Sequence, residues 1–186
     1  MKLKLLIVFL SCMLHLIAMS QTKSQFQTIV AAGIIEGGEK NAMLLQAING
    51  IRYKTWFSGV GTGFDYYNQR SIPLFLDIRK TVFDKSRSPF VYVDGGYHFP
   101  WLTGEKKSEY AGDIKAKGGL YYDAGIGYQM RNAKGVALAF SAGYSYKHFS
   151  CNVPQYYYCI WGNCPQTRQT FDYQLRRISI KAALGF

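Results

Sequence analysis

The sequence predicts an all-β protein, an eight-stranded antiparallel up-and-down transmembrane β-barrel that follows a cleaved signal peptide. Three observations predict this fold. Segments that alternate apolar and polar residues recur along the 186-residue chain, and glycine (19), tyrosine (15) and phenylalanine (12) are abundant. Beyond the N-terminus, no apolar run reaches the roughly 18 residues that a spanning helix needs. The contents of aromatic residues (16%) and charged residues (18%) also exclude a disordered chain.

The first 20 residues form the predicted signal peptide. Lys2 and Lys4 supply a basic start, residues 5–19 are almost entirely apolar, and Ser20 offers a small side chain at the cleavage point. A single anchoring helix is the alternative, but the apolar run is short and no basic stop-transfer cluster follows it. Cleavage after Ser20 leaves residues 21–186 as one barrel domain.

Eight segments carry the strand pattern, and the last one is the clearest. Ile178 and Ile180 share one face of that segment, whereas Arg177 and Lys181 share the other, as expected for a strand between an apolar and a polar medium. The first two segments are strand-like but ambiguous in phase. The eight segments are residues 26–36, 43–53, 56–66, 72–82, 89–99, 120–130, 136–147 and 172–186.

The polar face of these strands is rich in Gly, Ala and Ser and collects single charges. The interior of a narrow eight-stranded barrel is just wide enough for side chains, so we expect small residues to leave room there and opposite charges to pair. Structural ion pairs are the preferred interpretation, and a conduction path or a catalytic cluster is the alternative. The expected interior charges are Asp65, Asp77, Arg79, Asp94, Asp123, Lys147, Arg177 and Lys181.

The lengths of the connections predict an orientation. Outer-membrane barrels have short periplasmic turns and longer extracellular loops. Eight strands that start on the periplasmic side return the C-terminus to that side, so both termini are expected to be periplasmic. The short connections are residues 54–55, 84–88 and 131–135, and the opposite ones are residues 37–41, 68–71, 100–117 and 148–171.

The same orientation sorts the outward-facing aromatic residues into two belts at the expected membrane interfaces. The predicted outer belt consists of Tyr66, Tyr97, Phe99, Tyr144 and Tyr146, and the predicted inner belt of Tyr53, Trp56, Tyr128 and Phe186.

These features together resemble the small outer-membrane β-barrel proteins of Gram-negative bacteria, of the OmpA/OmpX type. The resemblance covers roughly residues 25–186 and is carried by the signal peptide, by the strands that contain residues 57–67 and 72–78, and by the terminal alternation that ends in Phe186. It implies that Phe186 and the alternate apolar residues before it are read by the barrel assembly machinery. The functions of this family are diverse, so the resemblance implies a fold more than an activity.

The pair His148-Phe-Ser150 is the candidate catalytic motif. It resembles the His-x-Ser pair of outer-membrane lipid A deacylases, in which the histidine deprotonates the serine and a carboxylate orients the histidine. No glutamate follows Ser150, and the only later acid is Asp172. We therefore expect no enzyme and interpret the pair as loop residues, with a lipid A-modifying esterase as the alternative.

The glycine series Gly59-x-Gly61-x-Gly63 lacks the spacing of a nucleotide-binding turn, and no helix follows it. Glycines at every second position instead place small residues on one strand face, inside the barrel.

Three cysteines, Cys151, Cys159 and Cys164, lie together in the predicted loop 148–171. Export favours a disulfide, and the odd number leaves the pairing open. Zinc binding with His148 is a weaker alternative, because no paired CxxC spacing is present. The loop is also aromatic and free of acidic residues, which suits contact with a partner or a glycan.

The predicted function is therefore a non-enzymatic outer-membrane protein with a structural or binding role through its extracellular loops, either alone or as a subunit of a larger outer-membrane complex. The net charge of +11 is dispersed through turns and rims, which favours outer-membrane lipid and lipopolysaccharide as partners over nucleic acid. No cofactor or metal is expected, and a small pore is disfavoured because eight strands leave little lumen. The ligand or partner and the cysteine pairing stay open.

Overall fold

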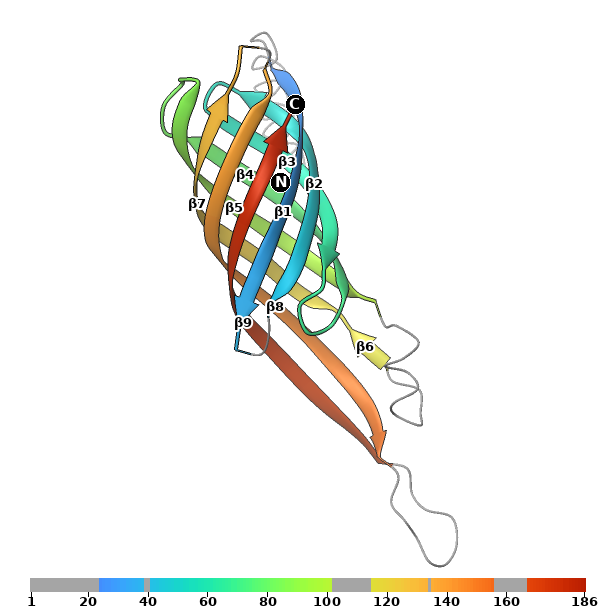
Figure 1. The fold of residues 1–186 in the computed structure, drawn as a ribbon. Coiled ribbons are helices and arrows are strands. Elements are labelled where there is room, and N and C mark those ends of the chain that lie inside the picture. The colour runs from blue at the N-terminus through green and yellow to red at the C-terminus, as the bar shows by residue number, and fades with distance from the viewer. Residues whose placement is uncertain (1–23, 39–40, 102–114, 134, 156–166) are drawn as a thin grey trace, which may run out of the picture.

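The strands of the computed structural model close into one barrel (Figure 1). The structure describes residues 24–38, 41–101, 115–133, 135–155 and 167–186. None of the described segments forms an α-helix long and apolar enough to cross a membrane. The strands are β1 (Gln25–Gly37), β2 (Ala42–Tyr53), β3 (Trp56–Asp65), β4 (Ser71–Thr81), β5 (Arg87–Pro100), β6 (Lys115–Lys117), β7 (Gly119–Arg131), β8 (Ala137–Gln155) and β9 (Thr167–Gly185).

Antiparallel pairing around a full circle closes the barrel. Each long strand pairs with its neighbours in the chain, and β9 pairs with both β8 and β1, so that Leu184 lies opposite Leu138 on one side and Val30 on the other. The short strand β6 precedes β7 and pairs with β8 just beyond the point where the pairing of β7 with β8 begins. The predicted eight-stranded antiparallel barrel is therefore confirmed, with β6 as an addition.

Short turns lie at one end of the barrel, which we call the turn end. Their described residues are 54–55, 82–86, 132–133 and 135–136. Lys54 and Gly135 adopt positive φ angles, 52° and 87° respectively, which let the chain reverse within a few residues. The start of β1 and the end of β9 lie at this end as well, as the pairing of Thr28 with Phe186 shows.

At the opposite end, the prediction that residues 148–171 form a loop is wrong for much of their length. β8 continues to Gln155 and β9 begins at Thr167, so the two strands form a hairpin that projects beyond the barrel (Figure 1). We call its described part, residues 148–155 and 167–176, the arm. The alternation of apolar and polar residues that marks the barrel strands is weaker here, because most described arm residues are at least partly exposed on both faces.

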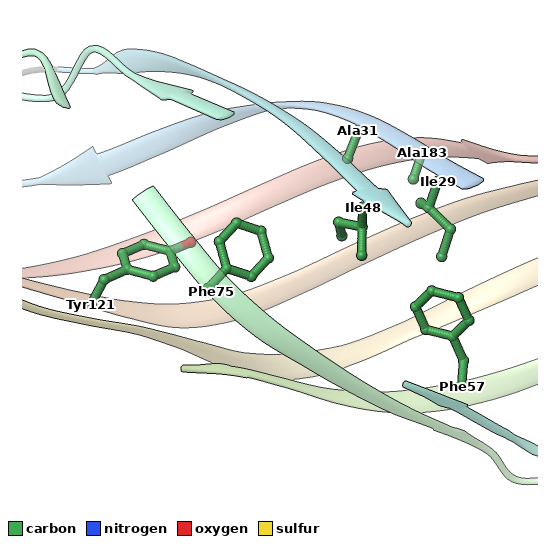
Figure 2. Packing of buried hydrophobic residues seen from close by; sticks show 7 residues of the cluster. All are labelled: Ile29, Ala31, Ile48, Phe57, Phe75, Tyr121 and Ala183. Atoms are coloured by element: carbon green, nitrogen blue, oxygen red, sulfur yellow. The ribbon is translucent and has the colours of Figure 1, made fainter. Parts of the chain in front are cut away.

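A cluster of apolar side chains occupies part of the lumen. Figure 2 shows the rings of Phe57, Phe75 and Tyr121 directed into the space that the strands enclose. Tyr121 lies on the face of its strand that the alternation assigns to the lumen, together with Asp123, whereas the sequence did not predict the inward positions of Phe57 and Phe75. The cluster consists of Ile29, Ala31, Ile48, Phe57, Phe75, Tyr121 and Ala183.

Glycines on β3 leave the room that these rings need. A Cβ added at Gly61 would lie 2.5 Å from the Cε2 atom of Phe75 and 3.0 Å from the Cγ1 atom of Ile48. The aromatic ring thus takes the place of a side chain at Gly61, and the alternating glycines have a packing role.

Candidate functional site: the charged lumen and the arm

Three aspartates lie side by side near the middle of the lumen. The strand register places Asp77 of β4 opposite Asp94 of β5, and Asp94 opposite Asp123 of β7, and all three are completely buried. Arg79 binds Asp77 through two nitrogens, with Nη2 at 2.7 Å from Oδ2. Lys181 Nζ lies 3.5 Å from Asp94 and 3.3 Å from Asp123. We call these five residues the central cluster, in which three carboxylates share two cations.

Neutral side chains complete the surroundings of Asp123. The Tyr92 hydroxyl donates to Asp123 Oδ1 at 2.7 Å, and the Ser179 hydroxyl donates to the same oxygen at 3.2 Å. The Lys181 ammonium also lies over the Tyr92 ring, 4.2 Å from its centroid. Gly143 makes this arrangement possible, because a Cβ there would meet the Tyr92 hydroxyl.

A second ionic cluster lies nearer the arm. Arg177 Nη1 is 2.6 Å from Asp65 Oδ2, and Lys147 Nζ is 3.4 Å from the same oxygen. Arg177 also donates to the Ser145 hydroxyl at 2.9 Å, and Lys147 donates to the Gln69 carbonyl at 2.6 Å. We call Asp65, Lys147 and Arg177 the arm-side cluster, in which two cations share one carboxylate.

The two clusters together balance four buried carboxylates against four cations. Such a lumen has the character of a packed polar core, since every one of these charges has an opposite charge within 3.5 Å. Between the central cluster and the turn end lies a space of about 20 Å³, bordered by Arg52, Arg79 and Phe90 among others. A space of this size holds about one water molecule. Among the described residues, the two ionic clusters and the apolar cluster occupy the middle of the lumen.

The outer face of the barrel has the opposite character. Ile126 is 68% exposed and Ile180 is 63% exposed, whereas Asp123 is 0% and Lys181 is 4% exposed. The residues predicted for the two aromatic belts lie on this outer face, and at the turn end the Lys80 ammonium lies 4.7 Å from the centre of the Trp56 ring. Apolar side chains therefore face the surroundings of the protein, and charges face its interior.

The candidate catalytic residues lie on the arm. Ser150 of β8 is directly opposite Asp172 of β9, and His148 is opposite Gln174, so His148, Ser150 and Asp172 share one face of the hairpin. The described hydrogen bond of His148 is through its backbone carbonyl, which the ring of His98 contacts. Among the described side chains, no hydrogen bond joins His148, Ser150 and Asp172.

The remaining residues singled out in the sequence are described in part. Phe186 is 63% exposed, and its backbone exchanges two hydrogen bonds with Thr28 of β1 at 2.8 and 2.9 Å. Cys151 lies on the arm at a partly buried position. Cys159, Cys164 and the predicted signal peptide lie outside the described residues, so the disulfide and the cleavage stay predictions.

Sequence reasoning missed two lumen features. One is the inward position of the Phe57 and Phe75 rings, for which the alternating glycines on β3 were the available signal. The other is the pair of arginines at the turn end, Arg52 and Arg131, which lie on the lumen-facing sides of β2 and β7. Both arginines lie at strand ends, where the alternating pattern indicates less clearly which face of the strand a residue occupies.

The fold and its ionic interior define a class, that of small closed eight-stranded antiparallel β-barrels. No protein-family model and no curated protein sequence matches the chain. Solved structures similar to it include two crystal structures of outer-membrane proteins. The outer membrane protein OprG from Pseudomonas aeruginosa superposes with a TM-score of 0.58 and 9% identity, over 87% of this chain and 95% of its own. Neisserial surface protein A (NspA) superposes with a TM-score of 0.50 and 11% identity, over 88% of this chain and 98% of its own.

These likenesses show the fold: the chain is a small eight-stranded antiparallel barrel that matches the outer-membrane proteins OprG and NspA in structure. The match spans nearly the whole length of both of those proteins, so the barrel is the common element.

Proposed function

We propose that this chain is an integral outer-membrane protein that spans the bilayer with its barrel and presents the arm to the cell exterior. One observation carries the proposal, namely the inverted distribution of apolar and charged side chains across the barrel wall. In lipid, apolar residues belong on the outer face, and every backbone polar group must be paired within the protein, as a closed barrel achieves. The likeness in fold to two outer-membrane proteins supports the same assignment.

The occupied middle of the lumen favours a structural or binding role over transport. The part available for binding is the arm, whose strand β9 pairs with β8 alone from Thr167 to Arg176 within the described residues. Its other edge offers backbone donors and acceptors, and Phe171 and Tyr173 offer exposed rings. Such an edge suits contact with a partner protein of the outer membrane, whereas the exposed Arg176 suits the phosphates of lipopolysaccharide. Phe186, the last residue of the terminal pairing, is proposed as the contact for the assembly machinery.

The orientation can be tested by cysteine labelling in intact cells. In a background with the native cysteines replaced by serine, Thr170→Cys on the arm and Asp84→Cys in a turn are compared with a membrane-impermeant maleimide. The proposal predicts that Thr170→Cys is labelled in intact cells and that Asp84→Cys is labelled only after lysis, with both variants in the outer-membrane fraction. If only Asp84→Cys is labelled in intact cells, the barrel has the orientation opposite to the one proposed. Recovery in the soluble fraction would remove the membrane assignment.

The register favours one second candidate, an esterase that acts on lipid A. Ser150 lies beside Asp172 and on the same face as His148, which are the residue types of a nucleophile, an acid and a base. The test is the mass of lipid A in cells that express the wild type, Ser150→Ala or the matched arm variant Thr170→Ala. An esterase predicts loss of an acyl chain with the wild type and Thr170→Ala but not with Ser150→Ala. The primary proposal predicts identical lipid A in all three.

A further inference from the structure

A cavity of about 410 Å³ lies at the turn end of the barrel, on the opposite side of the central cluster from the arm. This volume falls in the range of about 300–1,000 Å³ that is typical of small-molecule sites. Polar side chains line it from inside the barrel, and Phe26, Val136 and Phe186 border it at the outward-facing rim. The inward-facing members of the lining include Gln27, Arg52 and Arg131.

The two arginines in this cavity differ from the cations deeper in the lumen. Arg79, Lys147, Arg177 and Lys181 each lie within 3.5 Å of a carboxylate. Among the described residues, no ion pair involves Arg52 or Arg131.

The hydrogen bonds of Arg52 go to neutral acceptors, and two nitrogens of Arg131 have no acceptor. Arg52 is buried and donates from Nε to the Gln27 amide oxygen at 2.7 Å, and from Nη1 to the Thr81 hydroxyl at 3.5 Å. Arg131 has two buried side-chain nitrogens, Nε and Nη2, without a hydrogen-bond partner. Burying guanidinium nitrogens in this way is costly, so an anion in the cavity would stabilise the barrel.

Guanidinium groups bind phosphate through paired, charge-assisted hydrogen bonds. The cavity combines these donors with an apolar rim, and Phe26 and Phe186 on that rim are among the most exposed apolar residues of the outer face. If the barrel spans the bilayer as proposed above, this rim lies at the level of the lipid headgroups. A phosphate there can therefore reach the arginines either from the headgroup of a phospholipid or as a free anion.

We propose that the turn-end cavity is a phosphate-binding site in which Arg52 and Arg131 hold the anion. The proposal depends on the proposed function only where the bound phosphate belongs to a lipid headgroup. Binding of free phosphate in detergent solution depends on the cavity alone, so the failure of one proposal is distinguishable from the failure of the other.

The test is isothermal titration calorimetry of the full chain in an uncharged maltoside detergent. Two pairs of probes are used: inorganic phosphate against chloride, and short-chain phosphatidylglycerol against the matching diacylglycerol, which lacks the phosphate. The variants are Arg131→Gln, Arg52→Gln and their combination. The matched control is Arg87→Gln, which removes the same charge at an exposed position at the start of β5. Folding of each variant is checked by its heat-modifiable migration on gels.

We expect the wild type and Arg87→Gln to bind a phosphate-bearing probe, and each cavity variant to bind it about tenfold more weakly, as the loss of a charge-assisted hydrogen bond implies. The phosphate-bearing probe that binds should also raise the denaturant midpoint of the wild type but not that of Arg131→Gln. Because no hydrogen bond or ion pair is described for the Arg131 side chain, this variant should fold even if Arg52→Gln does not.

The pattern across the probes identifies the source. Binding of inorganic phosphate as tightly as phosphatidylglycerol supports a free-anion site, and binding of phosphatidylglycerol alone supports a headgroup site. The proposal is overturned if neither phosphate-bearing probe binds the wild type, if diacylglycerol binds as well as phosphatidylglycerol, or if Arg131→Gln binds the probe that the wild type binds as tightly as Arg87→Gln does.

Discussion

Asp65 illustrates how single residues stabilise the interior of this barrel. Its carboxylate accepts contacts from Arg177 at 2.6 Å and from Lys147 at 3.4 Å, and it also accepts the backbone N–H of Tyr67 at 2.8 Å. Removing one member of a buried ionic group leaves an uncompensated charge, which costs more than the pair itself contributes. The lumen charges should therefore be sensitive to single substitutions that neutralise one partner.

Asp65→Asn tests this sensitivity. Because the substitution leaves Arg177 and Lys147 buried without a counter-charge, we expect the free energy of unfolding to fall by about 3–5 kcal/mol. Asp84→Asn, the same change at an exposed turn position, should alter it by less than about 0.5 kcal/mol. Urea unfolding in detergent micelles measures both variants, and equal effects at the two positions would contradict a structural role for the arm-side cluster.

Two strand glycines allow a matched test of packing. Gly61→Val places a side chain against Phe75 and Ile48, and overpacking of this kind destabilises by about 1–3 kcal/mol. Gly95 lies on β5 with no atom within 4 Å of an added Cβ, so Gly95→Val should be neutral or slightly stabilising. Unfolding midpoints of the two variants decide the point. A stable Gly61→Val barrel would mean that the rings do not fill the lumen as described.

At this scale the sequence was informative about charges and less so about rings. The alternation of apolar and polar residues alone predicts that Asp123 and Lys181 point inward, because an uncompensated charge is not tolerated in lipid. It does not predict the inward positions of Phe57 and Phe75, since a ring is acceptable on either side of the wall. Their inward position depends on space left by glycines of the same and neighbouring strands, which only the register reveals.

At the scale of the element, the arm is the main departure from expectation. Strands in the barrel wall have an apolar outer side and a lumen side, and this difference between the two sides produces the alternating pattern. The arm has neither an apolar outer side nor a lumen side, so its polar and aromatic residues follow one another without regular alternation. Gln169 of β9 lies opposite Val153 of β8, and Tyr173 lies opposite Phe149. Its strand character rests instead on residues with high β propensity, including Val153, Thr170 and Phe171.

Shortening the arm should leave the barrel intact. A variant that joins Ser150 to Asp172 through an Asn-Gly turn removes arm residues whose described pairings are with each other and with β6. We expect its free energy of unfolding to change by less than about 1 kcal/mol, because a shorter connection also closes with less loss of entropy.

The matched control for this shortening is deletion of residues 179–182 from the same strand, which removes pairings with both β1 and β8 and should prevent closure. Heat-modifiable migration and urea unfolding report on both variants. Failure of the shortened protein to fold would show that the arm is part of the folding unit.

At the scale of the whole molecule, the protein has its core and its surface exchanged relative to a water-soluble domain. The eight strands, the closure of β1 on β9 and the short turns at one end follow from the sequence, because each depends on local alternation and spacing. The pairing of ionic groups across the lumen does not follow from the sequence, and neither does the turn-end cavity. Both depend on which inward residues the register brings to the same level.

If lipid surrounds the outer face of the barrel, brominated phospholipids will quench the fluorescence of a tryptophan placed on that face. In a background with Trp56, Trp101 and Trp161 replaced by phenylalanine, Ile180→Trp on the barrel is compared with Thr170→Trp on the arm. We expect strong quenching and blue-shifted emission at position 180 in brominated vesicles, with neither effect at position 170. Water-like, unquenched emission at position 180 from the folded protein would contradict the presence of lipid on the outer face.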